Sequence, residues 1–134
     1  MSAEQYLERI KKIDEMIRNK KEDHQRWVEI AEGLGGFSVG DKVQSSRNLR
    51  QIPDAIGRYI DIEQEINDLE QERQRIIKTI EKLPIDEYKI LYGIYVKDST
   101  MKDLAYSLGK SYRWVKQKRV DGLERVAELI GDKM

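Results

Sequence analysis

Residues 59–83, YIDIEQEINDLEQERQRIIKTIEKL, carry the heptad pattern that decides the expected fold. The pattern has alternating steps of three and four residues, and its positions are Tyr59, Ile62, Ile66, Leu69, Arg73, Ile76, Ile80 and Leu83. This spacing places mainly apolar side chains on one side of an α-helix. We expect the helix to begin near Pro53, because proline suits a first helical turn, and to stop before Pro84, because a residue that precedes proline disfavours helix.

A second heptad pattern predicts a helix from about Ala3 to Glu32. Its positions are Tyr6, Ile10, Ile13, Ile17, Lys20, His24, Trp27, Ala31 and Leu34. Gly33, Gly35 and Gly36 should end this helix, because glycine makes helical continuation costly. Neither helix can bury its apolar side alone, so we expect an antiparallel helical hairpin. Parallel self-association of each helix in a dimer is the rival arrangement.

The segment between the two helices, GGFSVGDKVQSSRNLRQI at residues 35–52, has no clear periodicity. We interpret it as a connector. The hydroxyl groups and Arg47 of its VQSSRN motif are an alternative site for phosphate or for a partner protein. A connector of this length counts against the helix assignment unless it is functional or contains a short helix.

Three shorter helices are expected after Pro84. In IDEYKILYGIYV, residues 85–96, one face carries Ile85, Tyr88, Leu91, Tyr92 and Tyr95. MKDLAYSL, residues 101–108, should be capped by Ser99 or Thr100 and closed by Gly109. SYRWVKQKRVDGLERVAELI, residues 111–130, should be capped by Ser111, and its buried stripe continues through Leu123, Val126, Ala127 and Ile130.

The last two of these helices, joined by a glycine turn, form the pattern of a helix-turn-helix. Ala105 lies four residues before Gly109 and Val115 six residues after it. A small residue is needed where the first helix crosses the second, and an apolar β-branched residue packs back into that crossing. Leu104 and Leu108 should supply the rest of this small core.

A run of basic residues lies within the predicted helix-turn-helix. Residues 110–119 contain five basic side chains and no acidic one, although the net charge of the chain is zero. Five like charges on one short helix repel each other unless a polyanion is present, so we expect DNA to bind here. A solvated helix face is the alternative interpretation. For Trp114 we favour packing over contact with DNA.

The predicted DNA-binding residues divide into two groups. Near the start of the second helix and one turn later, side chains should point into the major groove, and these are Ser111, Tyr112, Arg113, Lys116 and Gln117. Arg113 suits the acceptors of guanine, and Gln117 suits adenine. The predicted phosphate contacts are Lys102, Lys110, Lys118 and Arg119.

Composition excludes several classes of function. The chain has 134 residues, of which 37% are charged and 39% hydrophobic, and it has no cysteine. We expect neither a membrane span nor a secretory signal, and therefore a soluble protein in the cytoplasm. His24 is the only histidine, so a metal site is not expected, and a role in the register of the first seam is favoured. We find no phosphate loop and no nucleophile with a histidine partner, and we expect neither an enzyme nor a cofactor.

Two families share motifs with this sequence. TMKDLAYSLGKSYRWVKQKRVDGLERV, residues 100–126, resembles the region-four helix-turn-helix of the sigma-70 family. The likeness includes the glycine turn, the capping hydroxyl, VKQ and Leu123. Lys110, Trp114 and Lys118 depart from that family's usual residue types. DKVQSSRNLRQIPDAIGRYIDIEQEI followed by IEKLPIDEYKILYGIYV is similar to small phage-encoded regulators of Gram-positive bacteria, including the ArpU and RinA-like late-gene activators.

The resemblance implies a prophage transcription regulator in a bacterial host, which activates late genes and contacts RNA polymerase. From the composition and the helical spacing we expect an all-α protein. Residues 1–83 should form the hairpin as an assembly or interaction module, and residues 84–134 the helix-turn-helix domain. The expected partners are double-stranded promoter or operator DNA, RNA polymerase and a second copy of the chain. The alternative is a helical protein-interaction scaffold whose basic helix binds an acidic partner.

Overall fold

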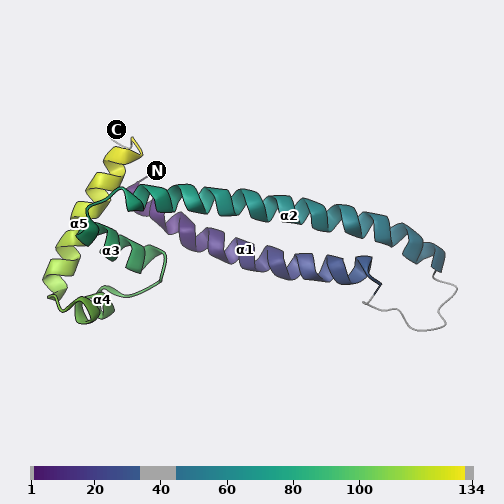
Figure 1. Ribbon diagram of the computed structural model, residues 1–134, viewed down its shortest axis with the longest axis horizontal. Helices are drawn as coiled ribbons and strands as arrows, with labels where there is room; N and C mark the ends of the chain where they lie inside the picture. The colour runs from purple at the N-terminus through teal and green to yellow at the C-terminus, as the bar shows by residue number, and fades with distance from the viewer. Residues whose placement is uncertain (1, 34–44, 132–134) are drawn as a thin grey trace. The chain divides into compact units, whose positions relative to one another are not determined.

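The chain is all-α throughout the residues that the computed structural model describes, which are 2–33 and 45–131 (Figure 1). Of residues 45–53 it describes the helical backbone alone. The helices are α1 (Ala3–Ala31), α2 (Ser45–Glu81), α3 (Ile85–Tyr95), α4 (Met101–Leu108) and α5 (Tyr112–Leu129). The predicted fold class, all-α, is confirmed for these residues.

The chain divides into two compact units. We call residues 1–14 and 71–134 the terminal unit and residues 15–70 the central unit. Helices α1 and α2 each contribute residues to both units, whereas α3, α4 and α5 belong to the terminal unit. The predicted division into domains at residues 83 and 84 stays a prediction.

The predicted limits of the long helices are confirmed at three of four ends. α1 begins and ends as expected, and α2 ends before Pro84. The predicted start of α2 near Pro53 is wrong, because the helix already begins at Ser45 and Pro53 lies inside it. Residues 45–52 contain neither glycine nor proline, so the helix continues on the N-terminal side of Pro53 although that proline costs one backbone hydrogen bond. Residues 35–44 of the expected connector, and the predicted seam position Leu34, lie outside the described residues.

Isoleucine and leucine side chains fill most of the predicted seams. On α1, Ile10, Ile13 and Ile17 are buried, but Leu7 is fully buried where the pattern favoured Tyr6, which is half-buried. The buried seam residues of α2 are Ile62, Leu69, Ile76 and Ile80. Burial of such side chains is the main stabilising contribution to a helical fold of this kind.

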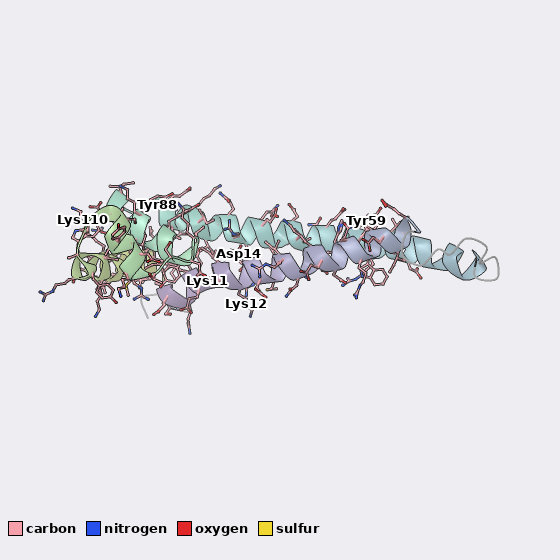
Figure 2. The ribbon with its side chains drawn as sticks, turned by 90° about the horizontal axis from the view of Figure 1, so that it is seen from below. Lys11, Lys12, Asp14, Tyr59, Tyr88 and Lys110 are labelled. Atoms are coloured by element: carbon pink, nitrogen blue, oxygen red, sulfur yellow. The ribbon has the colours of Figure 1, made fainter. Side chains whose placement is uncertain are left out.

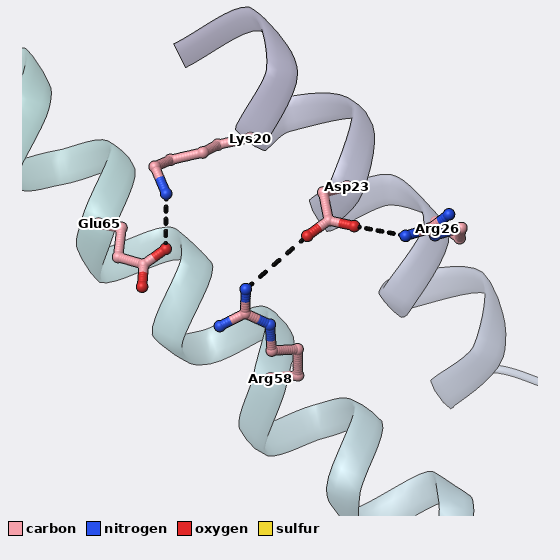
Figure 3. A network of polar contacts seen from close by, with 5 residues as sticks. All are labelled: Lys20, Asp23, Arg26, Arg58 and Glu65. Carbon is pink, nitrogen blue, oxygen red and sulfur yellow. Dashed lines mark hydrogen bonds and ion pairs between the residues drawn. The ribbon is translucent and has the colours of Figure 1, made fainter. Parts of the chain in front are cut away.

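Polar residues in and beside the seams form ion pairs, most of them between α1 and α2. In the central unit, Lys20 Nζ lies 2.9 Å from Glu65 Oε1, and Asp23 contacts both Arg26 and Arg58 (Figure 3). In the terminal unit, Arg73 Nε donates a hydrogen bond of 2.7 Å to Asp14 Oδ1. Polar residues can therefore occupy seam positions, since charges of opposite sign lie within reach.

The buried face of α3 agrees only in part with the predicted one, since Leu91 and Tyr95 are the two predicted residues that are buried. Ile85 was expected in the core, but 63% of it is exposed. The buried residues of α3 are Glu87, Ile90, Leu91, Gly93 and Tyr95. Positions 87, 90, 91 and 95 have a helical spacing as good as that of the predicted set, so periodicity alone could not choose between the two faces. Packing against α4 and α5 decides which face is buried.

Candidate nucleic-acid interface

Two capped helices and a glycine turn form the region where DNA binding was predicted. Thr100 Oγ1 accepts a hydrogen bond of 3.1 Å from the backbone N–H of Asp103 at the start of α4. Gly109 ends α4 in the left-handed conformation, with φ 67°. Ser111 Oγ accepts a hydrogen bond of 3.0 Å from the backbone N–H of Trp114 and caps α5. These bonds satisfy amide groups that have no partner inside the helix, and both predicted caps and the predicted turn residue are confirmed.

A small hydrophobic cluster holds α4 and α5 together. Its buried members are Ile90, Ala105 and Val115, and the partly buried residues against it are Ile94, Met101, Leu104, Leu108 and Trp114. The predicted core contained Ala105, Val115, Leu104 and Leu108, all of which are confirmed here. Ile90 was missed because it comes from α3, which the spacing around the glycine turn does not include.

Most of the predicted DNA-binding side chains are exposed. The exposed ones are Lys102, Lys110, Ser111, Tyr112, Arg113, Lys116 and Gln117. Val115, in the middle of this set, is fully buried, so the helical repeat directs Arg113 and Gln117 away from the core. Gln117 Nε2 donates a hydrogen bond of 2.9 Å to Asp121 Oδ1, which leaves the amide oxygen of Gln117 open to another donor.

Arg119 is held inside the terminal unit. Its Nη2 donates hydrogen bonds of 2.8 Å to Glu4 Oε1 and 3.1 Å to the hydroxyl of Tyr95. Burial raises the pKa of the Tyr95 hydroxyl, and the charge of Arg119 offsets part of that rise. A guanidinium with these partners is poorly placed to contact phosphate, so we leave Arg119 out of the interface proposed below, and the phosphate contact predicted for it stays a prediction.

Trp114 is half-buried, and its indole ring has two lysine neighbours. One side of the tryptophan packs against the hydrophobic cluster, which confirms the predicted packing role. The ammonium of Lys110 lies 5.2 Å from the ring centroid, and that of Lys118 lies 5.8 Å from it. Both distances suit cation–π attraction. Figure 2 labels Lys110 among the side chains of this region.

Two exposed side chains near the predicted site were missed. Tyr106 on α4 is 91% exposed, and Val120 on α5 is 41% exposed. Val120 lies seven residues after Arg113 and three after Gln117, so the helical repeat that selected those two residues could also have found it. Tyr106 has no comparable signal in the sequence, because an aromatic residue in an amphipathic helix normally packs.

Other candidate sites have structural explanations. His24 Nε2 lies 2.9 Å from Glu63 Oε2, and its ring meets the ring of Tyr59 edge to face at 5.5 Å between centroids. Among residues 2–33 and 45–131 we find no cluster of histidine, cysteine and carboxylate side chains suited to a metal ion. Within the same ranges, every helix is too short or too polar to cross a membrane.

Comparisons of the chain with family models, with curated proteins and with solved structures find no match.

Proposed function

We propose that this chain is a sequence-specific regulator of transcription that binds double-stranded DNA. One observation carries the proposal: the first turns of α5 present exposed basic and amide side chains, while Val115 on the same turns is fully buried. A helix packed in this way can enter the major groove without disturbing its own core.

The finer arrangement that we infer consists of two parts. α4 and α5 act as a helix-turn-helix, an assignment supported by the two caps and by the left-handed Gly109. α1 and α2 act as an antiparallel hairpin. In the central unit the ion pair Lys20–Glu65 and the hydrogen bond between His24 and Glu63 support this, because the residue numbers of the partners fall along α2 as those along α1 rise.

Base reading and phosphate binding are assigned to different side chains of α5 and its surroundings. Arg113 and Gln117, one helical turn apart, read bases through their paired donors and acceptors. Lys102, Lys110 and Lys118 contact phosphates, which orient the protein without selecting a sequence. Ser111, Tyr112 and Lys116 also face the major groove in this arrangement and complete the interface.

The sequence resemblance extends this proposal to biological context. We propose a phage or prophage origin, activation of late genes in the cytoplasm of a bacterial host, and contact with RNA polymerase. A homodimer would match a two-fold symmetric operator, because the two recognition helices of a dimer bind half-sites one helical turn apart. These parts of the proposal are supported by the sequence resemblance and not by the geometry of the interface.

Selection of bound duplexes from a random pool tests the proposed function. A shared motif among the selected sequences supports sequence-specific binding, and a palindromic motif indicates that two chains bind together. Arg113→Ala should then weaken binding to the selected duplex by ~1 to 3 kcal/mol and relax the preference at one base position. Affinity is measured by gel shift with excess competitor DNA at a fixed salt concentration.

Arg75→Ala serves as the matched control, because Arg75 is an exposed arginine of α2 in the same unit. It should leave both affinity and base preference unchanged. If Arg113→Ala and Gln117→Ala behave like this control, α5 is not the recognition helix. If no duplex is retained even at low salt, the alternative function, a scaffold that binds an acidic protein, takes precedence.

A further inference from the structure

The indole of Trp114 has two cationic neighbours, one from before α5 and one from inside it. Lys110 precedes the Ser111 cap, whereas Lys118 follows Trp114 by one helical turn. Their ammonium groups lie 5.2 and 5.8 Å from the centroid of the same ring. The ring is therefore the common partner of two side chains that would otherwise be free to move independently.

Neither ammonium group forms an ion pair in the part of the chain that the structure describes. The ion pairs of the described residues include neither Lys110 nor Lys118. Two ammonium groups beside one ring repel each other, and the attraction of each to the ring opposes this repulsion. A phosphate near both groups would relieve the repulsion and retain the cation–π contacts.

The position of Trp114 suits such a contact. Its packing against Ile90, Ala105 and Val115 fixes the ring relative to α4 and α5. One position earlier in the sequence, Arg113 is exposed, and the helical repeat turns it about 100° around α5 from Trp114. A DNA strand that borders the groove entered by Arg113 would therefore pass along the side of α5 that carries Trp114 and Lys118.

We propose that Trp114 is a positioning residue that holds Lys110 and Lys118 as a clamp for the phosphates of one DNA strand. This inference deepens the proposed function and rests on it. The lysines supply the charge and the hydrogen bonds to phosphate oxygens. The ring keeps both side chains in place before DNA arrives, so less conformational freedom is lost on binding.

A double-mutant cycle tests the clamp, with a random-sequence duplex as the probe. Trp114→Leu, which keeps an apolar side chain but removes the π face, should weaken binding by about two- to fivefold, the range expected from cation–π contacts at exposed sites. In a Lys110→Ala/Lys118→Ala background the same substitution should have almost no effect, because the side chains that it positions are gone. Trp114→Phe should retain most of the affinity.

Lys12→Ala provides the control for charge. Lys12 is an exposed lysine of α1 in the terminal unit and is labelled in Figure 2. The two cation–π pairs of Trp114 are formed by Lys110 and Lys118, not by Lys12. In a Lys12→Ala background, Trp114→Leu should still weaken DNA binding by about two- to fivefold. An equal loss in the wild-type and the lysine-deficient backgrounds would show that Trp114 acts only through packing, and would overturn the clamp.

Fluorinated tryptophan keeps the test decisive if Trp114→Leu fails to fold. Trp27→Phe first removes the other tryptophan, and Trp114 is then replaced biosynthetically by tryptophans of increasing fluorine content. Fluorine withdraws electron density from the ring and weakens cation–π attraction with little change in shape. Affinity for the duplex should fall stepwise with fluorine content, and a constant affinity would overturn the inference.

The proposed function and the clamp fail in different ways. A wild-type chain that binds no duplex at any salt concentration overturns the proposed function and the clamp with it. A wild-type chain that binds duplex DNA, but whose affinity is indifferent to fluorination of Trp114, keeps the proposed function and loses the clamp alone.

Discussion

Gly109 shows how a single residue determines the geometry of the proposed interface. Its φ of 67° lies in the left-handed region, where the backbone of a residue with a Cβ atom is strained. A Cβ atom added to Gly109 would meet nothing within 4 Å, so the strain of a substitution would come from the backbone alone. The turn between α4 and α5 therefore requires glycine for its backbone conformation, and not because neighbouring atoms would clash with a side chain.

Gly109→Ala should lower the free energy of unfolding by ~1 to 2 kcal/mol. Gly109→Asn should cost less, because asparagine tolerates the left-handed conformation better than alanine does. Urea denaturation followed by circular dichroism measures both differences. An alanine variant as stable as the wild-type chain would mean that the turn can adopt another conformation at little cost.

Between helices, Gly122 sets how closely α5 approaches α3. A Cβ atom at this position would lie 2.9 Å from Leu91 Cδ1 and 3.4 Å from the Cβ of Glu87. Both α3 residues are buried, and Glu87 Oε1 lies 2.8 Å from Arg125 Nε on α5. A larger residue at 122 would displace Leu91 or push the two helices apart, and would disturb the ion pair between the buried Glu87 and the exposed Arg125.

Gly122→Ala should destabilise the chain by ~1 to 3 kcal/mol, the usual cost of overpacking a core. The matched control is Gly57→Ala in α2, where an added Cβ atom meets nothing within 4 Å. Alanine forms helix better than glycine, so the control should stabilise the chain by ~0.5 to 1 kcal/mol. Opposite shifts of the urea midpoint are expected, and a stabilising Gly122→Ala would contradict the close approach.

For the whole molecule, the terminal unit combines both ends of the sequence. Arg119 of α5 bonds to Glu4 of α1, and Lys11 of α1 lies 2.9 Å from Asp98, which precedes α4. Lys11 is labelled in Figure 2. Surface ion pairs contribute little singly, but here they accompany buried residues of α1 in the same unit, such as Leu7 and Ile10.

A fragment of residues 84–134 should therefore be much less stable than the full chain. It lacks Glu4, Lys11 and the parts of α1 and α2 that belong to the terminal unit. We expect a lower melting temperature and reduced helix content by circular dichroism. Full-length Glu4→Gln, which removes one exposed ion pair, should lose less than about 1 kcal/mol. A fragment that melts like the full chain would support the predicted domain boundary at residues 83 and 84.

Local patterns were sufficient to predict most of the secondary structure. Heptad spacing predicted α1 and most of α2, and the hydroxyls and glycine around residues 99–111 predicted α4, the turn and the start of α5. These features depend on neighbours within a few residues, such as the bond from Ser111 to the amide of Trp114, so they can be read from the chain alone. The early start of α2 was missed because proline is only a probable helix boundary.

Contacts between distant segments were decided by the tertiary structure. The pattern in α3 was compatible with two buried faces, and only packing against α4 and α5 selected the one with Glu87 and Ile90. Arg113 and Arg119 were both expected to contact DNA, yet Arg119 bonds to Glu4 and Tyr95 while Arg113 remains exposed. Periodicity shows which residues of a helix share a face, whereas the partner of that face depends on residues far away in the sequence.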